Sequence, residues 1–302
     1  MKRVCVLGGS GFVGQSLCKA LVDKGWLLRV PSRRALSPTD PLHALPGVET
    51  RQCDIHDPLV LREQFANCDA VINLVGILNE SGSDGSGFRH AHVELTRKVI
   101  HACEECNIPR LLHMSALHAN AEHGPSHYLF SKGQAEELLV EAGKRGLGVT
   151  RFCPSIIFGP GDSFFNRFAG LLRFAPVFPL ACPEARFAPV YVEDVVRAYV
   201  MSLDDDETIG ERYELCGPNV YTLRELVAYT AKTCGMKRLI IGLNDTASSL
   251  QARMLGLLPG KPMSYDNYLS LTVDSVCEKG FPLRFGIAVA LEEIVPGYLC
   301  KT

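Results

Sequence analysis

Two side chains four residues apart carry the clearest signal for acid–base chemistry. Tyr128 and Lys132 stand at the ends of the segment YLFSK, and this spacing puts both on one face of a helix. A free tyrosine has a pKa of about 10, and a neighbouring ammonium lowers that pKa toward the range where the phenol transfers protons at neutral pH. Ser115, which ends an apolar run, is the expected hydroxyl donor to a substrate oxygen.

A glycine-rich segment, GGSGFVG at residues 8–14, follows an apolar strand-like run and precedes a helical pattern. Glycines at this spacing permit a tight turn, close approach of the backbone to a pyrophosphate, and close helix packing. The helix N-terminus then offers free N–H groups to the phosphates. A glycine triplet alone is weak evidence, but the order strand, glycines, helix is the confirming context. We expect a dinucleotide to contact Gly8, Ser10, Gly11, Phe12, Val13 and Gly14.

The end of the second expected strand indicates which dinucleotide is bound. An NAD site usually has Asp or Glu there for the ribose hydroxyls, whereas this chain has Ser32, Arg33 and Arg34. Guanidinium groups suit a 2′-phosphate. We therefore predict NADP(H) in preference to NAD(H); the alternatives are NAD(H) itself and a solvated basic loop. Asp54, with Ile55, is expected at the adenine edge, and a surface role for Asp54 stays open.

The elements that must position these residues alternate between strand-like and helical patterns. Expected strands are Arg3–Leu7, Trp26–Val30, Val48–Cys53, Ala70–Leu74, Arg110–Met114 and Gly148–Phe152. Expected helices are Phe12–Lys24, Pro58–Ala66, Arg89–Cys106 and Tyr128–Lys144. This alternation predicts an α/β fold with a Rossmann-type doubly wound parallel sheet.

After Cys153 the pattern becomes irregular and rich in proline and glycine. Helices are expected at Glu193–Leu203, Leu223–Cys234 and Thr246–Leu258, the second opening on a capping box of Thr222 and Glu225. We expect a nucleotide-binding domain over residues 1–152. Residues 153–302 should form a smaller lobe over the carboxyl ends of the strands, with strands that return to the main sheet.

Composition narrows the class of protein. The 302 residues carry 31 basic and 33 acidic side chains, a net charge of −2, which excludes the basic stripe of a nucleic-acid-binding protein. No apolar run is long enough for a transmembrane helix, and the first residues lead directly into a strand and leave no room for a signal peptide. Twelve scattered cysteines favour reduced thiols in the cytoplasm over a disulfide framework.

Two groupings of metal-ligating residue types are weak. Cys103 and Cys106 form a CxxC without a second pair at zinc spacing. The histidines at 113, 118, 123 and 127 follow no zinc motif and are expected in loops and core. We predict no metal site.

These motifs together resemble the extended or atypical branch of the short-chain dehydrogenase/reductase superfamily. GGSGFVG, NLVG at 73–76, Ser115, Tyr128, Lys132, RFCPS at 151–155 and FGPGD at 158–162 carry the resemblance. Within that branch the chain is similar to proteins like the NADPH-binding accessory subunit of respiratory complex I and its bacterial epimerase/dehydratase-like relatives. Residues 72–78, 113–117, 155–168 and 190–198 carry this closer similarity.

The resemblance implies a Rossmann fold, tightly held NADPH and a link to ubiquinone systems. It assigns Ser115, Tyr128 and Lys132 as the catalytic triad, and adds cofactor contacts from Leu74, Val75, Gly76, Tyr128, Lys132, Pro154 and Ser155. The segment that covers a sugar nucleotide in epimerases is Phe-rich here, so Phe164 and Phe168 either pack on the core or line an opening for a quinone, isoprenoid or protein partner. Arg186 is a candidate contact for a diphosphate.

Three functions follow from these patterns. One is an oxidoreductase with a small or hydrophobic, quinone-like substrate. Another is a non-catalytic NADPH-holding component of complex I or of ubiquinone biosynthesis, peripheral to the inner membrane. The third is a nucleotide-sugar epimerase or dehydratase. The retained triad favours an enzyme.

Overall fold

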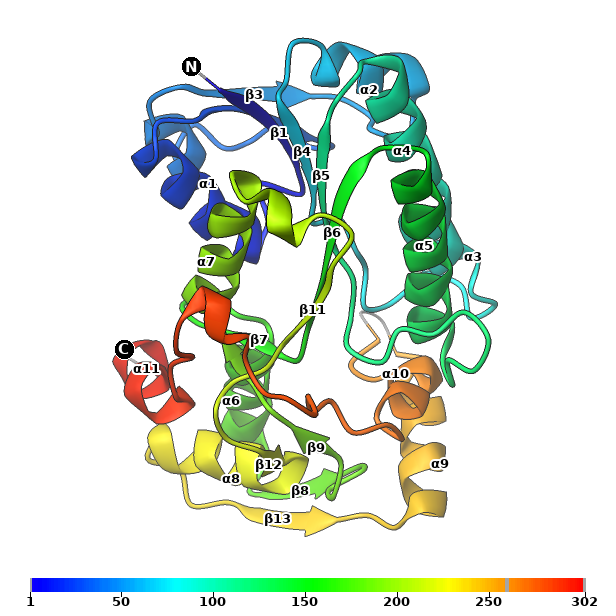
Figure 1. Cartoon of the computed structure of the whole chain (residues 1–302). Coiled ribbons are helices and arrows are strands. Elements are labelled where there is room, and N and C mark those ends of the chain that lie inside the picture. Colours follow the sequence, from blue (N-terminus) through cyan, green and yellow to red (C-terminus); the bar gives the residue numbers. More distant parts are fainter. Residues whose placement is uncertain (1, 259–260, 301–302) are drawn as a thin grey trace.

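Seven parallel strands form the central sheet of the computed structural model, which describes residues 2–258 and 261–300 (Figure 1). The spatial order is β11-β6-β5-β4-β1-β2-β3. The strands are β1 (Arg3–Leu7), β2 (Leu27–Ser32), β3 (Val48–Gln52), β4 (Ala70–Asn73), β5 (Arg110–Met114), β6 (Gly148–Pro154) and β11 (Arg212–Leu215). The order reverses between β4 and β2 on either side of β1, which confirms the predicted doubly wound Rossmann-type sheet.

Helices cover both faces of this sheet (Figure 1). On one face lie α1 (Phe12–Asp23) and α7 (Val192–Leu203). On the other lie α2 (Pro58–Phe65), α4 (Leu95–Glu105) and α5 (His127–Lys144). The predicted helix over 89–106 is preceded by the short α3 (Ser86–Phe88) and begins with a π-helical turn, η2 (Arg89–Glu94), before α4.

The two helical layers explain why the strands read as continuous apolar runs. Val4 and Val6 of β1 pack toward α1 and α7, whereas Cys5 and Leu7 pack toward α2 and α4. Successive strand residues point to opposite faces, so a strand covered on both faces must be apolar at every position.

Segments after residue 152 contribute to this main layer as well as to a separate lobe. Strand β11 pairs in parallel with β6, and α7 packs against α1. The rest forms the lower part of Figure 1, with its own core around Phe165, Leu172 and Val227. Its helices are α6 (Phe164–Phe174), α8 (Leu223–Thr233), α9 (Asp245–Leu255), α10 (Tyr265–Ser270) and α11 (Leu291–Tyr298). Its short strands are β7 (Ile157–Phe158), β8 (Val177–Leu180), β9 (Arg186–Phe187), β10 (Val190–Tyr191), β12 (Tyr221–Thr222) and β13 (Leu239–Gly242). Three 3-10 turns, η1 (Pro41–Ala44), η3 (Asp206–Thr208) and η4 (Leu283–Phe285), complete the connections.

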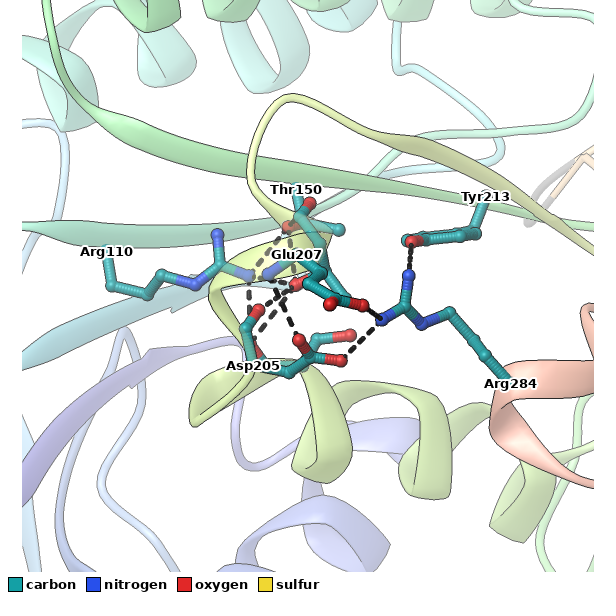
Figure 2. Close-up of polar contacts among 8 residues, drawn as sticks. Arg110, Thr150, Asp205, Glu207, Tyr213 and Arg284 are labelled. Atoms are coloured by element: carbon teal, nitrogen blue, oxygen red, sulfur yellow. Dashed lines mark hydrogen bonds and ion pairs between the residues drawn. The ribbon is translucent and has the colours of Figure 1, made fainter.

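A buried arginine fixes the connection from α7 to β11 (Figure 2). Arg110, at the start of β5, is 6% exposed. Its guanidinium donates to Thr150 Oγ1 at 2.7 Å, to Thr208 Oγ1 at 2.6 Å and to the Ser202 carbonyl at 2.8 Å. Beside this cluster Arg284 donates to Asp205 at 2.7 Å. These bonds tie the irregular α7–β11 segment to the amino end of the sheet.

The expected strand bounds differ from the structure by one or two residues at β2, β3, β4 and β6, and one strand of the sheet was not expected. Strand β11 was not among the expected strands, because four residues with two charges give no periodic signal until β6 pairs with them. Strand β2 runs through Pro31 to Ser32 instead of ending at Val30. Pro31 is tolerated because β1 pairs with β2 only as far as Arg29, so no neighbouring strand needs its missing N–H.

The expectation of reduced cysteines throughout is wrong for four of them. Cys216 is bonded to Cys277, and Cys234 is bonded to Cys300. These partners are 61 and 66 residues apart, a separation that sequence spacing cannot pair. The other eight cysteines are free thiols, five of them buried.

Over residues 2–258 and 261–300, no helix combines the length and apolar character that crossing a bilayer needs. In the same part of the chain, no three His, Cys, Asp or Glu side chains converge as a metal site would require.

Candidate functional site

The predicted site residues come together at the carboxyl edge of the parallel sheet. Ends of parallel strands on either side of a switch in strand order create a crevice where nucleotides bind. The glycine segment follows β1, and Ser32 ends β2 beside Arg33 and Arg34. Pro154 ends β6, and further candidates follow β3, β4 and β6: Asp54, Ile55, Leu74, Val75, Gly76 and Ser155.

The backbone of the glycine segment is packed so tightly that no side chain fits at Gly14. Gly8 has a φ of 81°, in the left-handed region. A Cβ on Gly14 would lie 2.3 Å from the Gly8 carbonyl oxygen. Gly11 is the N-cap of α1 and provides no side-chain cap, so the first-turn N–H groups of Phe12 and Val13 are left for a ligand. This cradle fits a pyrophosphate.

Arginines near the end of β2 divide into two kinds. Arg29 is engaged by the protein, donating to the Gln64 carbonyl at 2.8 Å and pairing with Glu49 at 3.3 Å. Arg33 and Arg34 are both exposed, and neither has a carboxylate within ion-pair distance among the described residues. Two guanidinium groups are therefore available at the position where a 2′-phosphate would lie.

The segment after β3 presents a compact turn at the expected adenine edge. Asp54 accepts a hydrogen bond from the His56 N–H at 2.9 Å, and Ile55 is buried. The His56 ring stacks on His90 at a centroid distance of 3.8 Å. Asp54 is exposed, and its carboxylate stabilises the turn that follows β3. This position is compatible with a surface role and with a contact to the adenine.

Lys132 is the most strongly perturbed cation of the site. Its side chain lies in α5, is 3% exposed, and donates to the Met114 carbonyl at 3.0 Å. A Cβ on Gly76 would lie 3.1 Å from Lys132 Nζ, so glycine lets the β4 loop approach the amine. Burial lowers the pKa of Lys132 to about 8.

His92, which the sequence did not indicate, forms a wall of the site. Its Nε2 accepts from the Ile77 N–H at 3.1 Å, so its Nδ1 carries the proton and donates to Ser131 Oγ at 2.8 Å. Ser131 in turn donates to the Tyr128 carbonyl at 2.9 Å. Burial lowers the pKa of His92 to about 2. The π-helical turn η2, a feature frequent at functional sites, holds this ring and could not be predicted from residue spacing.

Tyr128 lies in an aromatic setting at the start of α5. Its ring is 6.0 Å from Phe88 and 5.6 Å from His92, both edge-on. Burial raises the pKa of Tyr128 to about 12, so the lowering by a neighbouring ammonium that the sequence predicted is wrong for the protein without its cofactor. Among the residues that the structure describes, its hydroxyl has no hydrogen-bond partner, so the phenol is free to meet a substrate.

Among the described residues, Ser115 is hydrogen-bonded to a carboxylate and not to either of the other two members of the predicted triad. Its Oγ donates to Glu136 at 2.5 Å, and Glu136 is also bound by Arg212 at 2.9 Å. Cys153 Sγ contacts the same carboxylate at 3.4 Å. Glu136 follows Lys132 by four residues on α5, a spacing from which its position on the same helical face could have been predicted.

A segment from the C-terminal lobe holds the start of α5. Asp266, in α10, accepts from the His127 N–H at 2.6 Å and from the Tyr128 N–H at 3.3 Å. Lys261 donates to the Glu80 carbonyl at 2.9 Å in the loop after β4. Two lobes of the chain therefore meet at Tyr128, which sequence analysis did not indicate.

Candidate residues after β6 are engaged by the lobe to different extents. Ser155 Oγ donates to the Ser275 carbonyl at 2.7 Å, and Pro154 pairs with Leu215 in the sheet. Arg186 is exposed, and its backbone and guanidinium both face Asp274. Its contact with a diphosphate stays a prediction.

The two phenylalanines expected near a substrate lie half-buried on α6. Phe164 and Phe168 contact each other edge-on at 5.0 Å. Phe165 between them is fully buried in the lobe core. The helix therefore packs on the core through Phe165 and leaves part of the other two rings accessible. This is compatible with core packing and with an opening for an apolar ligand or partner, the two alternatives that the sequence left open.

Comparison with known proteins identifies the family. The model of the NAD dependent epimerase/dehydratase family matches residues 4–216. The chain belongs to this family. Among solved structures, MoeE5 in complex with UDP-glucuronic acid and NAD superimposes with a TM-score of 0.76 at 18% identity, over 99% of this chain and 98% of that one. DesIV, a dTDP-glucose 4,6-dehydratase of Streptomyces venezuelae with NAD bound, also gives 0.76 at 18% identity, over 98% and 95%. At these identities the two structures confirm the fold.

Sequence relatives include respiratory and reductase proteins. The mitochondrial NADH dehydrogenase [ubiquinone] 1 alpha subcomplex subunit 9 of Arabidopsis thaliana is 31% identical over 229 residues, covering 73% of this chain. The chain spans only 55% of that plant subunit and 59% of its mouse counterpart. A ceramide reductase of Caulobacter vibrioides is 27% identical over 252 residues, covering 80% of this chain and 74% of that protein. The predicted membership of the superfamily and the similarity to the complex I subunit are thus confirmed.

Proposed function

We propose that this protein is an NADP(H)-dependent reductase of an apolar carbonyl or quinone-like substrate. The observation that carries the proposal is the placement of Tyr128 and Lys132. Both lie on α5 at the edge where the glycine cradle opens, with the amine buried beside Gly76. Tyr128 and Lys132 are one helical turn apart on the same face of α5, and a phenol unpaired within the described residues, one turn from a buried amine, is an arrangement suited to general acid catalysis.

The cofactor would be held by groups from three strand ends. The free N–H groups of α1 would bind the pyrophosphate, Arg33 and Arg34 the 2′-phosphate, and Lys132 the nicotinamide ribose. When bound, NADPH supplies the hydride for reduction of the substrate. The absence of any carboxylate over residues 28–34 favours the phosphorylated cofactor; NAD(H), which the two solved structures above contain, is the alternative.

Each residue around the phenol has a separate task. Tyr128 donates the proton to the substrate oxygen, and the charge on Lys132 lowers the cost of the phenolate that remains. His92, kept neutral by burial, orients the first turn of α5 through Ser131. The ring of Phe88 helps to exclude water from this side of Tyr128.

An apolar substrate is supported by the surface of α6 and by two relatives. Phe164 and Phe168 leave apolar rings accessible next to the lobe core. The relatives are the Caulobacter vibrioides ceramide reductase and a 29% identical protein of Stigmatella aurantiaca. The latter is named 4-hydroxy-2-methyl-3-oxo-4-farnesyl-3,4-dihydroquinoline-1-oxide ketoreductase and matches over 54% of this chain.

Cofactor choice is tested by fluorescence titration with NADPH and NADH. The double variant Arg33→Ser/Arg34→Ser should weaken NADPH binding by about 10- to 100-fold. Each charge-assisted hydrogen bond contributes about 1.5–3 kcal/mol, and solvent screening reduces this contribution because both arginines are exposed. NADH binding should stay unchanged. Arg29→Ser is not a suitable control because Arg29 holds backbone carbonyls, so Lys19→Ser, an exposed change on α1, serves instead. Equal affinity of the native protein for both nucleotides would overturn the NADP(H) preference.

Catalysis is tested with Tyr128→Phe and a panel of ketones and short-chain quinones followed by NADPH oxidation. The variant should retain NADPH binding and lose turnover by about 100-fold or more. Phe130→Leu, two residues along and partly exposed, is the matched control. Unchanged turnover in Tyr128→Phe would remove the assignment.

A second function is favoured by one specific contact. Ser115 Oγ is held by Glu136, so the hydroxyl that would complete the triad is engaged elsewhere. This supports a non-catalytic component that holds NADPH within a respiratory assembly of the inner membrane, as the mitochondrial relatives suggest. That protein would retain NADPH through purification, gain thermal stability from it, and oxidise it with no ketone or quinone of the panel.

A further inference from the structure

The outer end of the C-terminal lobe carries an exposed apolar face. In the parallel pair β8–β13, Val177 lies opposite Leu239 and Pro179 lies opposite Ile241. Val177 is 48% exposed, Leu239 60% and Ile241 45%. The alternate residues of both strands pack toward the lobe core. The lobe is thus closed without these outward side chains, which have no partner in the described chain.

Phe174 extends this face. It is the last residue of α6, directly before β8, and is 89% exposed. An aromatic ring this exposed, three positions before the first residue of β8, contributes little to the fold. Contiguous apolar surface of this kind marks a place where a protein meets another surface.

Positive charge predominates in the two segments that carry β8 and β13, and the acidic residues that flank them are engaged, Glu184 by Arg224 and Asp245 by the Tyr268 hydroxyl. Residues 163–183 and 226–244, which form α6, β8, most of α8 and β13, contain no Asp or Glu. The same two segments contain Arg167, Arg173, Lys232, Lys237 and Arg238. The whole chain has a net charge of −2, so this local excess of positive charge is a property of the lobe end. Its electrostatic complement is an anionic surface.

The basic groups lie next to the apolar ones. Arg238 donates to the Leu172 carbonyl at 2.6 Å and to the Arg173 carbonyl at 3.4 Å, which places its charge at the end of α6 beside Phe174. Arg173 and Lys237 are exposed, and neither pairs with a carboxylate of the described chain.

Helix α9 continues the pattern. It follows β13 after two residues, and Gln251 holds it beside β8 by donating to the Pro179 carbonyl at 3.0 Å. Its outward positions Leu250 and Met254 are one turn apart and are 59% and 62% exposed, and Leu257, two residues beyond the helix, is 87% exposed. Arg253 lies among them and is exposed.

We propose that this end of the lobe docks on a lipid bilayer that carries anionic headgroups. Phe174 and the outward aliphatic residues of β8, β13 and α9 would enter the interface, and the surrounding Lys and Arg side chains would meet the phosphates. The inference goes beyond the proposed function, because it concerns where the protein binds and does not depend on what the nucleotide site does.

The test is co-sedimentation of the full chain with vesicles of phosphatidylcholine alone or with added phosphatidylglycerol. We expect binding to the anionic vesicles only, weakened by salt. Phe174→Asp should lower the partition coefficient by about tenfold or more, because it removes an inserted ring and adds a like charge to the lipid. Arg173→Glu/Lys237→Glu should lower it at least as much and reduce the salt dependence.

Ile287→Asp is the matched control, since Ile287 is 84% exposed but lies after η4, outside this face. It should bind vesicles like the native protein, and circular dichroism should show that all variants keep the native fold. Failure to bind anionic vesicles, or an equal loss in Ile287→Asp, would overturn the proposal. The proposal would also be overturned if an acidic protein bound at Phe174 while the purified chain did not bind vesicles.

Discussion

Acidification should destabilise this protein through two buried neutral histidines. Burial lowers the pKa of His92 to about 2 and holds the pKa of His113 well below its usual range. His92 Nε2 faces the Ile77 N–H and cannot accept a proton without losing that bond. His113 Nδ1 faces the Asn73 side-chain amide at 3.3 Å. Both rings therefore stay neutral in the folded state.

The sign and size of the effect follow from proton linkage. In the unfolded chain each histidine has a pKa of about 6.5, so below that pH the unfolded state binds protons that the folded state refuses. Stability contributed by each neutral ring is present above about pH 6.5 and is lost as the pH falls. Between about pH 7.5 and about pH 5.5 each ring should lower the free energy of unfolding by about 1.4 kcal/mol, or about 2.7 kcal/mol together.

Urea denaturation at several pH values measures this loss. His92→Gln, which can still accept from Ile77 and donate to Ser131, should show a loss smaller than the native one by about 1.4 kcal/mol. His123→Gln is the control, because the His123 side chain is 83% exposed, and should show the full loss. Comparing slopes with pH removes any constant cost of the substitution. A slope for His92→Gln equal to that of the native protein would refute the assignment of a neutral buried His92.

Four further changes test other parts of the structure. Lys132→Met should abolish turnover yet raise the free energy of unfolding near neutral pH by about 1–3 kcal/mol in urea denaturation, because the buried amine disfavours folding where its pKa is lowered to about 8. Arg110→Met should lower the free energy of unfolding by about 3 kcal/mol or more, because it leaves buried hydroxyl and carbonyl groups without a donor. A decrease below about 1 kcal/mol, as for a surface substitution, would show that water replaces the guanidinium as donor. Gly14→Ala should remove NADPH binding in titration, since its Cβ would meet a loop carbonyl at 2.3 Å. Cys216→Ser, which breaks the bond to Cys277, should lower the free energy of unfolding by about 2–4 kcal/mol, and a thiol count of all twelve cysteines under denaturing conditions would contradict the bond.

The sequence predicted the sheet and the cofactor edge because both depend on local patterns. Apolar runs covered on both faces and separated by helical segments can form only a small set of parallel sheets. Gly8 and Gly14 are required by backbone geometry within one turn, and Tyr128 and Lys132 by one helix. These features involve residues close in sequence, so spacing alone locates them.

Contacts between distant segments were decided only by the tertiary structure. Ser115 could be placed at the end of β5 from sequence, but its bond to Glu136 depends on how α5 lies across the sheet. His92 enters the site because a π-helical turn rotates it toward Ser131, and β11 exists because β6 offers it an edge. Each of these outcomes depends on packing between segments that no local pattern relates, which is why the elements followed from the sequence while the partners of their side chains did not.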